Sequence, residues 1–357
     1  MQFKRDIRLS SDDYLKTYFT FKVGDIAFEG HQSKEFRYGR FVENDIGDGV
    51  VSHIFTVFRP IQRFDLHFWK YAINSENLMQ KILSRSTKAS TMMHDLVPED
   101  FLNETFLVPS IDEQKAVGKF LHQIDTLLTL HQRKYEKLLN IKKSMLEKMF
   151  PKEGEVVPEI RFKGFTGAWE QRVLGDFLEV SMETNSSAKF DKNDVLSISG
   201  DYGVVNQIAF QGRSFASNSV VKYGVLHNED IVYTKSPLKA NPYGIIKTNK
   251  GKAGIVSPLY AIYHPKNNLV PSFVQSYFEQ NERLNNYLRP LVNKGAKNNM
   301  LISNEKAISG KVIFPSRKEQ EKISALLERV DSLLTLHQRK LEMLKNVKQA
   351  FLEKMFV

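Results

Sequence analysis

Apolar residues recur every three or four positions along two long stretches of the chain. This spacing is that of the a and d positions of a coiled coil, sustained in each stretch over about four to five heptads. The pattern predicts one long helix over residues 109–150 and another over residues 315–357. The apolar positions are Val117, Leu121, Ile124, Leu128, Tyr135, Leu138, Met145 and Met149, and then Ile323, Leu327, Val330, Leu334, Leu341, Leu344, Phe351 and Met355.

The two stretches are copies of one element, offset by 206 positions. The sequence DxLLTLHQRK occurs at residues 125–134 and again at residues 331–340, and PSxxEQ starts at Pro109 and at Pro315. An unbroken repeat of this length predicts the same structure twice, and two such rods are expected to pack against each other. A capping box is predicted at each helix start, formed by Ser110 with Glu113 and by Ser316 with Glu319.

Polar residues interrupt the apolar pattern at equivalent places, namely at His131 and His337 and at Lys142 and Lys348. Polar a and d residues commonly fix the register and orientation of paired helices. This interpretation is favoured over a metal site, because no second ligand lies four residues further on the same face.

The segments before and between the long helices are also related, with an offset of 205 positions. Residues 23–28 (VGDIAF) match residues 228–233 (NEDIVY), and Pro60 matches Pro265. After one extra residue in the second copy, the expected pairs are Tyr71 with Tyr277, Leu78 with Leu284 and Lys88 with Lys294. The chain is therefore predicted to contain a globular unit followed by a long helix, twice.

Alternating apolar residues predict strands at residues 54–58 and 259–263, and helical stretches follow at residues 68–83 and 272–288. The fold class predicted is α/β, with two mixed α/β globular domains alternating with two long helices. The domain boundaries expected are 1–108 for the first globular domain, 109–150 for the first helix, 151–160 for a linker rich in Pro, Gly and charge, 161–314 for the second domain and 315–357 for the second helix.

Composition narrows the classes of function. The 357 residues carry a formal charge of +10, which favours a polyanionic partner, and they include no cysteine, which excludes disulfides and thiol nucleophiles. The first residues are charged and lack the apolar core of a signal peptide, and no apolar run is long enough to cross a bilayer. A cytoplasmic location is expected.

The globular copies differ most in loops that carry cationic and amide side chains. Lysine and arginine suit phosphates, and Asn and Arg can form bidentate hydrogen bonds with base edges. The residues predicted to contact nucleic acid are Lys34, Arg37, Arg40 and Lys88 in the first copy, and Lys235, Lys239, Asn241, Tyr243, Arg289, Lys294, Lys297, Asn298 and Asn299 in the second.

A second apolar stripe on the long helices exceeds what one helix pair needs. It comprises Leu127, Leu130 and Ile141 in the first helix, and Leu333, Leu336 and Val347 in the second. We expect this stripe to bind a protein partner.

The order of these elements resembles the specificity subunit of a type I restriction-modification system. The resemblance covers nearly the whole chain and is strongest in the two PSxxEQ-led helices and in GFTGAWEQRVLGDF at residues 164–177. It implies two target recognition domains, each reading half of a split DNA sequence, and an antiparallel coiled coil that spaces them. It further implies methyltransferase and restriction subunits as partners, with no cofactor, no metal and no catalysis in this chain.

The chain departs from that family at its beginning. By the offset of 205, the segment from Ile160 to Val205 has no counterpart before Gln2, so the first recognition domain is expected to be truncated at its N-terminus. Three explanations stay open: a start further upstream, a separate fragment that supplies the segment, or a defective first domain.

Two other classes of function were weighed. An enzyme is disfavoured, because Asn241-Pro242-Tyr243 is an incomplete amino-methyltransferase motif and the carboxylates Asp100 and Glu113 are not both kept in the second copy. No P-loop and no HExxH motif occurs. A coiled-coil adaptor that binds RNA or non-specific DNA fits the helices, but it leaves the two diverged globular units unexplained.

Overall fold

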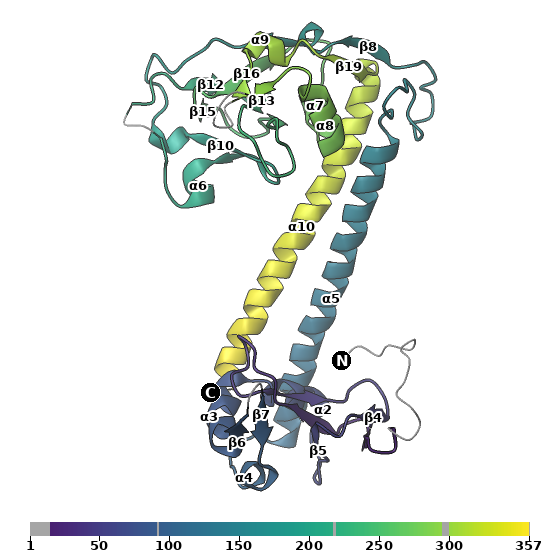
Figure 1. Cartoon of the computed structure of the whole chain (residues 1–357), viewed down its shortest axis with the longest axis vertical. Coiled ribbons are helices and arrows are strands. Elements are labelled where there is room, and N and C mark those ends of the chain that lie inside the picture. Colours follow the sequence, from purple (N-terminus) through teal and green to yellow (C-terminus); the bar gives the residue numbers. More distant parts are fainter. Residues whose placement is uncertain (1–14, 91–92, 217–218, 295–299, 357) are drawn as a thin grey trace. The chain divides into compact units, whose positions relative to one another are not determined.

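The computed structural model describes residues 15–90, 93–216, 219–294 and 300–356, and the chain divides into two compact units (Figure 1). Unit 1 contains residues 1–135 and 336–357, and unit 2 contains residues 136–335. Among the described residues, no helix is long and apolar enough to span a membrane.

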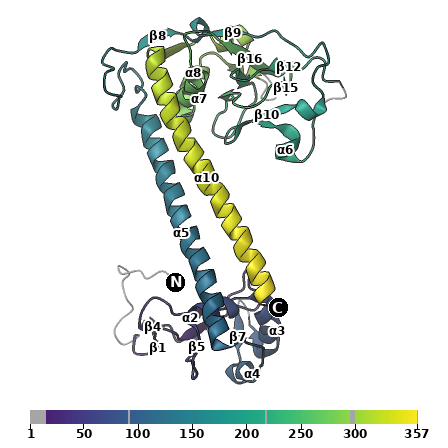
Figure 2. The ribbon, with the colours of Figure 1, turned by 180° about the vertical axis from the view of Figure 1, so that it is seen from behind.

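Both predicted long helices are present, as α5 (Ile111–Lys148) and α10 (Arg317–Met355), and each contributes one part to each unit. In unit 1 the first part of α5 lies beside the last part of α10, where Leu121 packs with Leu352 and Phe356 (Figure 2). Most predicted a and d residues are buried or half-buried, but Phe351 and Met355 are exposed. Phe351 nevertheless lies edge-to-face against Phe120 of α5, with their ring centres 4.7 Å apart, so the departure from the predicted seam is limited to Met355 in the last turn of α10.

The two predicted capping boxes differ in the structure. At the start of α5, the Glu113 N–H donates to Ser110 Oγ at 3.4 Å. At the start of α10, the Glu319 carboxylate is buried and accepts two hydrogen bonds from Arg161, at 2.6 and 2.7 Å. The reciprocal cap predicted for Glu319 is wrong, because its carboxylate is engaged by the guanidinium group.

Unit 1 is built on a three-stranded antiparallel sheet in the order β3-β2-β5. Its predicted strand at residues 54–58 is shorter than expected, since Phe55 donates a turn hydrogen bond to Ser52. The strands of this sheet are β2 (Ile26–Glu29), β3 (Arg40–Glu43) and β5 (Thr56–Phe58). Two further antiparallel pairs are β1 (Phe19–Phe21) with β4 (Gly49–Val51), and β6 (Thr87–Ala89) with β7 (His94–Leu96).

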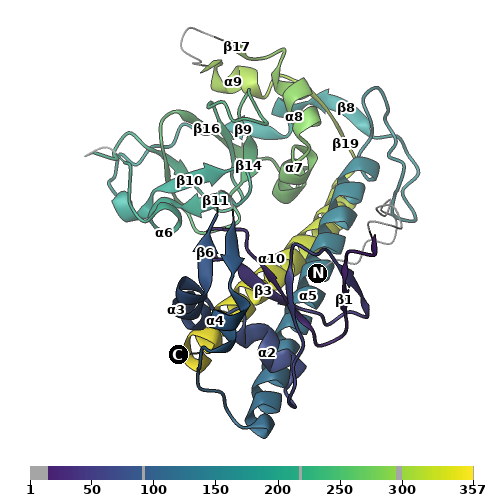
Figure 3. The same cartoon turned by 60° about the horizontal axis from the view of Figure 1, so that its bottom comes forward.

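Two helices, α2 (Leu66–Ala72) and α3 (Glu76–Ser86), replace the single helical stretch predicted at residues 68–83. The prediction is wrong because the Asn74 amide donates to the carbonyl of Lys70 and Ser75 has an extended backbone, which together end one helix and begin the next. A short α4 (Pro98–Leu102) lies against α3 (Figure 3).

Unit 2 contains a four-stranded antiparallel sheet in the order β14-β13-β16-β9. These strands are β9 (Leu178–Val180), β13 (Ile231–Thr234), β14 (Ile246–Thr248) and β16 (Tyr260–Pro265). Four further pairs are β8 (Glu170–Val173) with β19 (Lys311–Phe314), β10 (Leu196–Ser199) with β11 (Gly203–Asn206), β12 (Gly224–Leu226) with β15 (Gly254–Val256), and β17 (Asn293–Lys294) with β18 (Met300–Leu301).

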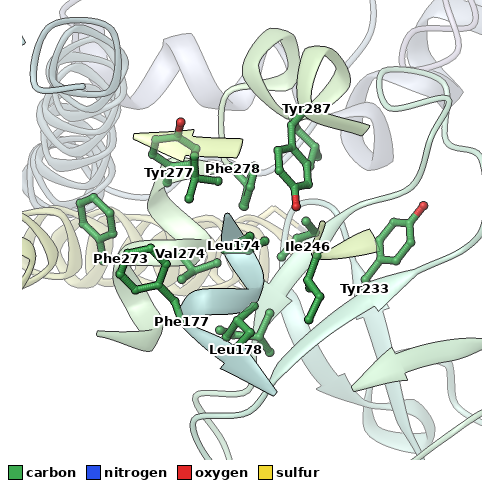
Figure 4. Packing of buried hydrophobic residues seen from close by; sticks show 14 of the residues in the cluster. Leu174, Phe177, Leu178, Tyr233, Ile246, Phe273, Val274, Tyr277, Phe278 and Tyr287 are labelled. Carbon is green, nitrogen blue, oxygen red and sulfur yellow. The ribbon is translucent and has the colours of Figure 1, made fainter. Parts of the chain in front are cut away.

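The core of unit 2 joins this sheet to the long helices. Phe273, Val274 and Tyr277 of α7 pack with Leu174, Phe177 and Leu178 (Figure 4). The same cluster includes Ile323 and Leu327 of α10. As in unit 1, two helices, α7 (Pro271–Tyr277) and α8 (Asn281–Leu288), replace the single helix predicted at residues 272–288. The other short helical segments of unit 2 are η1 (Leu174–Asp176), η2 (Lys192–Asp194), α6 (Gln207–Gln211) and α9 (Asn304–Ala307).

The two units repeat one topology. The second copy has one extra residue, which was predicted to precede Tyr277 but lies further along the chain. Helices α2 and α7 both begin at the offset of 205, and so do α3 and α8. The buried residues Met79, Ile82 and Leu83 accordingly correspond to Leu284, Tyr287 and Leu288. The predicted pairs Tyr71 with Tyr277 and Leu78 with Leu284 are therefore wrong, and the offset becomes 206 only between α8 and the β17–β18 hairpin.

Glu43 on β3 is a carboxyl group buried in unit 1. Only 5% of Glu43 is exposed, and neither carboxyl oxygen has a hydrogen-bond partner among the described residues. Burial, reinforced by the nearby charge of Asp45, raises the pKa of Glu43 to about 8. Glu43 is therefore protonated in folded unit 1 at neutral pH.

This gives a testable pH dependence. The unfolded chain releases the Glu43 proton near its ordinary pKa of 4.5, whereas unit 1 holds it up to about pH 8. The stability of unit 1 should therefore fall as pH rises between these values, by up to about 1.4 kcal/mol per pH unit. Glu43→Gln should remove this slope, and Glu35→Gln, at an exposed position, should keep it.

Urea unfolding can be followed by the fluorescence of Trp69, which lies in unit 1, in a Trp169→Phe background. Equal slopes for Glu43→Gln and Glu35→Gln would contradict a protonated Glu43.

Candidate nucleic-acid interface

The loop between β2 and β3, together with the first residue of β3, places three of the predicted cations on the surface of unit 1. Lys34, Arg37 and Arg40 are exposed. Arg40 forms an ion pair with Glu29 at 2.8 Å, and the Arg37 guanidinium lies 5.6 Å from the centre of the Tyr38 ring. Because Arg40 is partly neutralised, Lys34 and Arg37 are the better candidates for phosphate contacts.

The corresponding loop of unit 2 lies between β13 and β14, and its predicted residues have different environments. Lys239 is exposed, whereas Lys235 is half-buried and donates to Asn304 at 2.7 Å. Burial lowers the pKa of Lys235. Asn241 is buried and donates to Asn281 at 2.9 Å, so the structure gives it a packing role. Tyr243 is half-buried, and its carbonyl accepts a hydrogen bond from Tyr233.

One glycine closes each of these two loops. Gly39 and Gly244 have φ of 95° and 92°, a left-handed conformation that favours glycine. A Cβ would lie 2.6 Å from the Glu29 carbonyl oxygen at Gly39 and 1.9 Å from the Thr234 carbonyl oxygen at Gly244. Both units therefore use the same glycine conformation where the loop ends and the next strand begins, although the loop residues before the glycine differ.

The remaining predicted contacts lie on hairpins and at a helix end. Lys88 is exposed on β6, and Arg289 is exposed at the end of α8. Lys294 belongs to β17, the counterpart of β6. Lys297, Asn298 and Asn299 lie outside the described residues.

Sequence reasoning did not single out an exposed group of rings and cations in unit 2. The Tyr202 and Phe210 rings contact each other at a tilt, with their centres 5.3 Å apart, and the Arg213 guanidinium lies 4.5 Å from the centre of the exposed Phe215 ring. The alternation of aromatic and basic residues at 210–215 was the available signal. Exposed rings and a cation of this kind can contact the sugars and phosphates of a nucleic acid.

The glutamine of each PSxxEQ motif connects a long helix to the domain that precedes it. Gln320 donates to the Pro315 carbonyl at 3.0 Å and accepts from the Val270 N–H, the residue before α7, at 2.9 Å. Gln114 donates to the Pro109 carbonyl at 2.9 Å and accepts from the Asp65 N–H, the residue before α2, at 3.4 Å. We call these two contacts the glutamine latches.

The polar residues of the helix seam also pair between the two helices. In unit 1, Lys348 donates to Asp125 at 2.7 Å, and in unit 2 Lys142 contacts Asp331 at 2.6 Å. Burial lowers the pKa of Lys142, but Glu279 and Asp331 more than offset this, so the net pKa is raised. The Nδ1 atoms of His131 and His337 lie 2.8 Å apart, which requires one to donate and the other to accept.

The predicted protein-binding stripe is open to solvent at its leucines. Leu127, Leu130 and Leu336 of unit 1 and Leu333 of unit 2 are exposed, while Val347 and Ile141 are half-buried. In the described part of the chain, no three His, Asp or Glu side chains are grouped so that they could hold a metal ion.

The latches predict an asymmetric effect of mutation. Gln320→Leu leaves the Val270 N–H without its acceptor and should destabilise unit 2 by about 1–3 kcal/mol. Gln114→Leu should cost unit 1 less, because its bond to the Asp65 N–H is longer. Gln349→Leu is the control, because this side chain is exposed and donates to Glu353 of its own helix rather than to another segment.

Urea unfolding would be followed by Trp169 fluorescence for unit 2 and by Trp69 fluorescence for unit 1, with the other tryptophan replaced by Phe. A loss for Gln320→Leu no larger than that of Gln349→Leu would show that the latch does not hold the domain.

Comparison with known proteins gives two kinds of likeness. No family model matches the chain. A curated protein described as the specificity subunit of the type I restriction enzyme MjaX, from Methanocaldococcus jannaschii, is 22% identical over 278 residues. The match covers 71% of this chain and 60% of that protein. The chain thus spans less than two thirds of the length of this curated relative.

Among solved structures, the S subunit of the type I restriction-modification system from M. genitalium superposes with a TM-score of 0.56 at 16% identity, covering 96% of this chain and 85% of that one. The HsdS subunit from Thermoanaerobacter tengcongensis has a TM-score of 0.45 at 17% identity, covering 94% and 81%. The first of these likenesses supports the fold. The chain is similar, in sequence and in fold, to the specificity subunits of type I restriction-modification systems.

Proposed function

We propose that the chain is a sequence-specific DNA-binding subunit, without catalytic activity of its own, that reads a DNA target in two halves. The observation that carries this proposal is the repeat: one topology occurs in both units, each closed by the same glycine and glutamine contacts, with different loops. Two equivalent scaffolds with different surface loops are suited to reading two different sequences.

The charge of the loops supports DNA as the ligand. Lys34, Arg37, Lys88, Lys239 and Arg289 are exposed, and the whole chain carries a formal charge of +10. Cations on loops neutralise phosphates and give affinity that falls steeply with salt, while side chains at the loop tips read base edges. The proposed recognition domains are residues 1–108 and 161–314, joined to the helices at 109–150 and 315–357 with a linker at 151–160.

The long helices are proposed to form an antiparallel coiled coil that spaces the two domains. The ion pairs Asp125–Lys348 and Asp331–Lys142 and the His131–His337 contact support this role, because each joins α5 to α10. Polar seam contacts favour one register of two helices over a shifted one. Methyltransferase and restriction subunits are the proposed partners, with the exposed leucine stripe as the docking surface.

The spacing role can be tested by lengthening the helices where they face each other. One heptad inserted after Arg133 and one after Arg339, beside the His131–His337 contact, adds about 10 Å to each helix. This length equals about three base pairs of DNA at roughly 3.4 Å each. The gap between the two half-sites should grow while the half-site sequences persist.

The measurement is a map of methylated sites in host DNA with the gene deleted, with the natural gene and with the lengthened gene. An unchanged gap would contradict the spacing role. Methylation that does not depend on the gene would contradict the proposed function as a whole, and stronger retardation of structured RNA than of duplexes carrying the site would favour an RNA adaptor.

The docking surface gives a separate prediction. Leu130→Glu with Leu336→Glu should abolish co-purification with the methyltransferase subunit, because charge cannot be buried in an apolar interface without a partner. Leu139→Glu is the matched control: Leu139 is also an exposed leucine of α5, but nine residues from Leu130 places it on the opposite side of the helix.

Circular dichroism should show that both the double variant and the control variant stay folded. Co-purification that survives in the double variant would rule out the stripe as the docking surface.

A further inference from the structure

The β2–β3 loop of unit 1 and the β13–β14 loop of unit 2 contain a turn at the same place. The Ser33 N–H donates to the Phe36 carbonyl at 3.0 Å, and the Leu238 N–H donates to the Asn241 carbonyl at 3.0 Å. The two pairs of residues correspond by the offset of 205. We call the two four-residue segments that these hydrogen bonds close the tip turns.

Each tip turn presents a lysine at its second position. Lys34 and Lys239 correspond by the offset of 205, and both are exposed. The other residues of the turn differ between the copies, which read SKEF and LKAN. The two turns therefore share a closing hydrogen bond and one cation, and differ in the remaining side chains.

In unit 2 the first residue of α8 contacts the tip turn. Asn241 is buried, and its side-chain amide donates to Asn281 Oδ1 at 2.9 Å. The Asn285 side chain donates to the Ala240 carbonyl at 3.0 Å. Because residues four apart lie on one face of a helix, α8 holds the turn at two points from the same face.

In unit 1 the equivalent residue of α3 contacts the same loop through different chemistry. Glu76 is the first residue of α3 and corresponds to Asn281 by the offset of 205. Its half-buried side chain accepts from the N–H of Arg37, the residue that follows the tip turn, at 3.3 Å. The position of the contact is thus shared, while the groups that form it are particular to each copy.

We propose that Glu76 and Asn281 are positioning residues that hold the tip turns, so that Lys34 and Lys239 are presented at equivalent places of the two loops. A buried amide without an acceptor is costly, so the unit 2 turn is favoured in the conformation in which Asn281 accepts from Asn241. The use of the two lysines as phosphate contacts rests on the proposed function, whereas the hold on the turns does not.

Such a hold would contribute to binding without touching the ligand. A loop that is ordered before binding loses less conformational freedom when it binds, which raises its affinity. Lysine contacts with phosphates carry no sequence information, so equivalent lysines would give both half-sites a common contact, while the differing neighbours read the bases.

The test in unit 2 measures hydrogen exchange of the full chain. Asn281→Ala removes the acceptor and should speed exchange of the Leu238 amide about 5-fold, the equivalent of one ordinary hydrogen bond. Asn281→Asp keeps an acceptor and should exchange as the natural chain does. Glu282→Ala is the matched control, because Glu282 is the next exposed residue of α8 but lines a pocket with Pro151 and Lys311.

The same comparison applies to unit 1. Glu76→Ala should speed exchange of the Arg37 amide about 5-fold, and Glu76→Gln, which keeps an acceptor, should not. Asn77→Ala, at the next and exposed position of α3, is the control. Unchanged exchange in the alanine variants of Glu76 and Asn281, or exchange that rises equally throughout β2 and β13, would overturn the proposal.

A second readout separates this inference from the proposed function. Duplexes that the natural chain selects from a random-sequence pool should bind Asn281→Ala about 5-fold more weakly, and Asn281→Asp should restore most of the affinity. A natural chain that selects no sequence would contradict the proposed function, while exchange would still decide whether the turns are held. Full affinity in Asn281→Ala despite faster exchange would overturn the role of this hold in binding.

Discussion

The arrangement of each domain on its long helix depends on a buried amide. The side-chain amide of the glutamine in PSxxEQ makes two hydrogen bonds. It donates to the carbonyl of the proline that precedes the long helix, and it accepts from the N–H of the residue just before α2 or α7. One planar group with a donor and an acceptor thereby joins the start of the long helix to a segment that lies 50 residues earlier for Gln320 and 49 residues earlier for Gln114. An apolar side chain of the same size would fill the space but leave the buried N–H of Val270 unpaired, which is the costlier outcome.

The same scaffold tolerates different polar groups in its two copies. Asp25 and Asp230 occupy equivalent places, but Asp25 pairs with Arg59 at 2.6 Å and Asp230 with His264 at 2.7 Å. The Arg59 hydrogen bond lowers the pKa of Asp25. Glu43 of unit 1 corresponds to Thr248 of unit 2, whose hydroxyl donates to the Pro271 carbonyl. Unit 1 therefore has a buried carboxyl group where unit 2 has a satisfied hydroxyl group.

Sequence pattern predicted the features that depend on periodicity. The long helices, their repeat and the mixed α/β class all follow from spacing, and α5 and α10 begin within two residues of the predicted starts. The broken helices were missed because the break at Asn74 and Ser75 depends on a local side-chain hydrogen bond, which has no periodic signature. The role of Glu319 was missed because its partner Arg161 lies far away in sequence. Among the candidate contacts, Asn241 is buried, which its residue type alone does not reveal.

The contacts between the two long helices constrain which substitutions each copy of the repeat can accept. Each Asp–Lys pair takes its aspartate from one copy of DxLLTLHQRK and its lysine from the other copy of the helix, so a change in either copy must suit a partner in the other. The glycines that close the β2–β3 and β13–β14 loops keep the same left-handed conformation, although the loop residues before them differ between the two copies. After a duplication, the two helices would thus keep a common sequence while the two loops diverge, so that the loop surface of one half of the chain can change while the other half stays as it was.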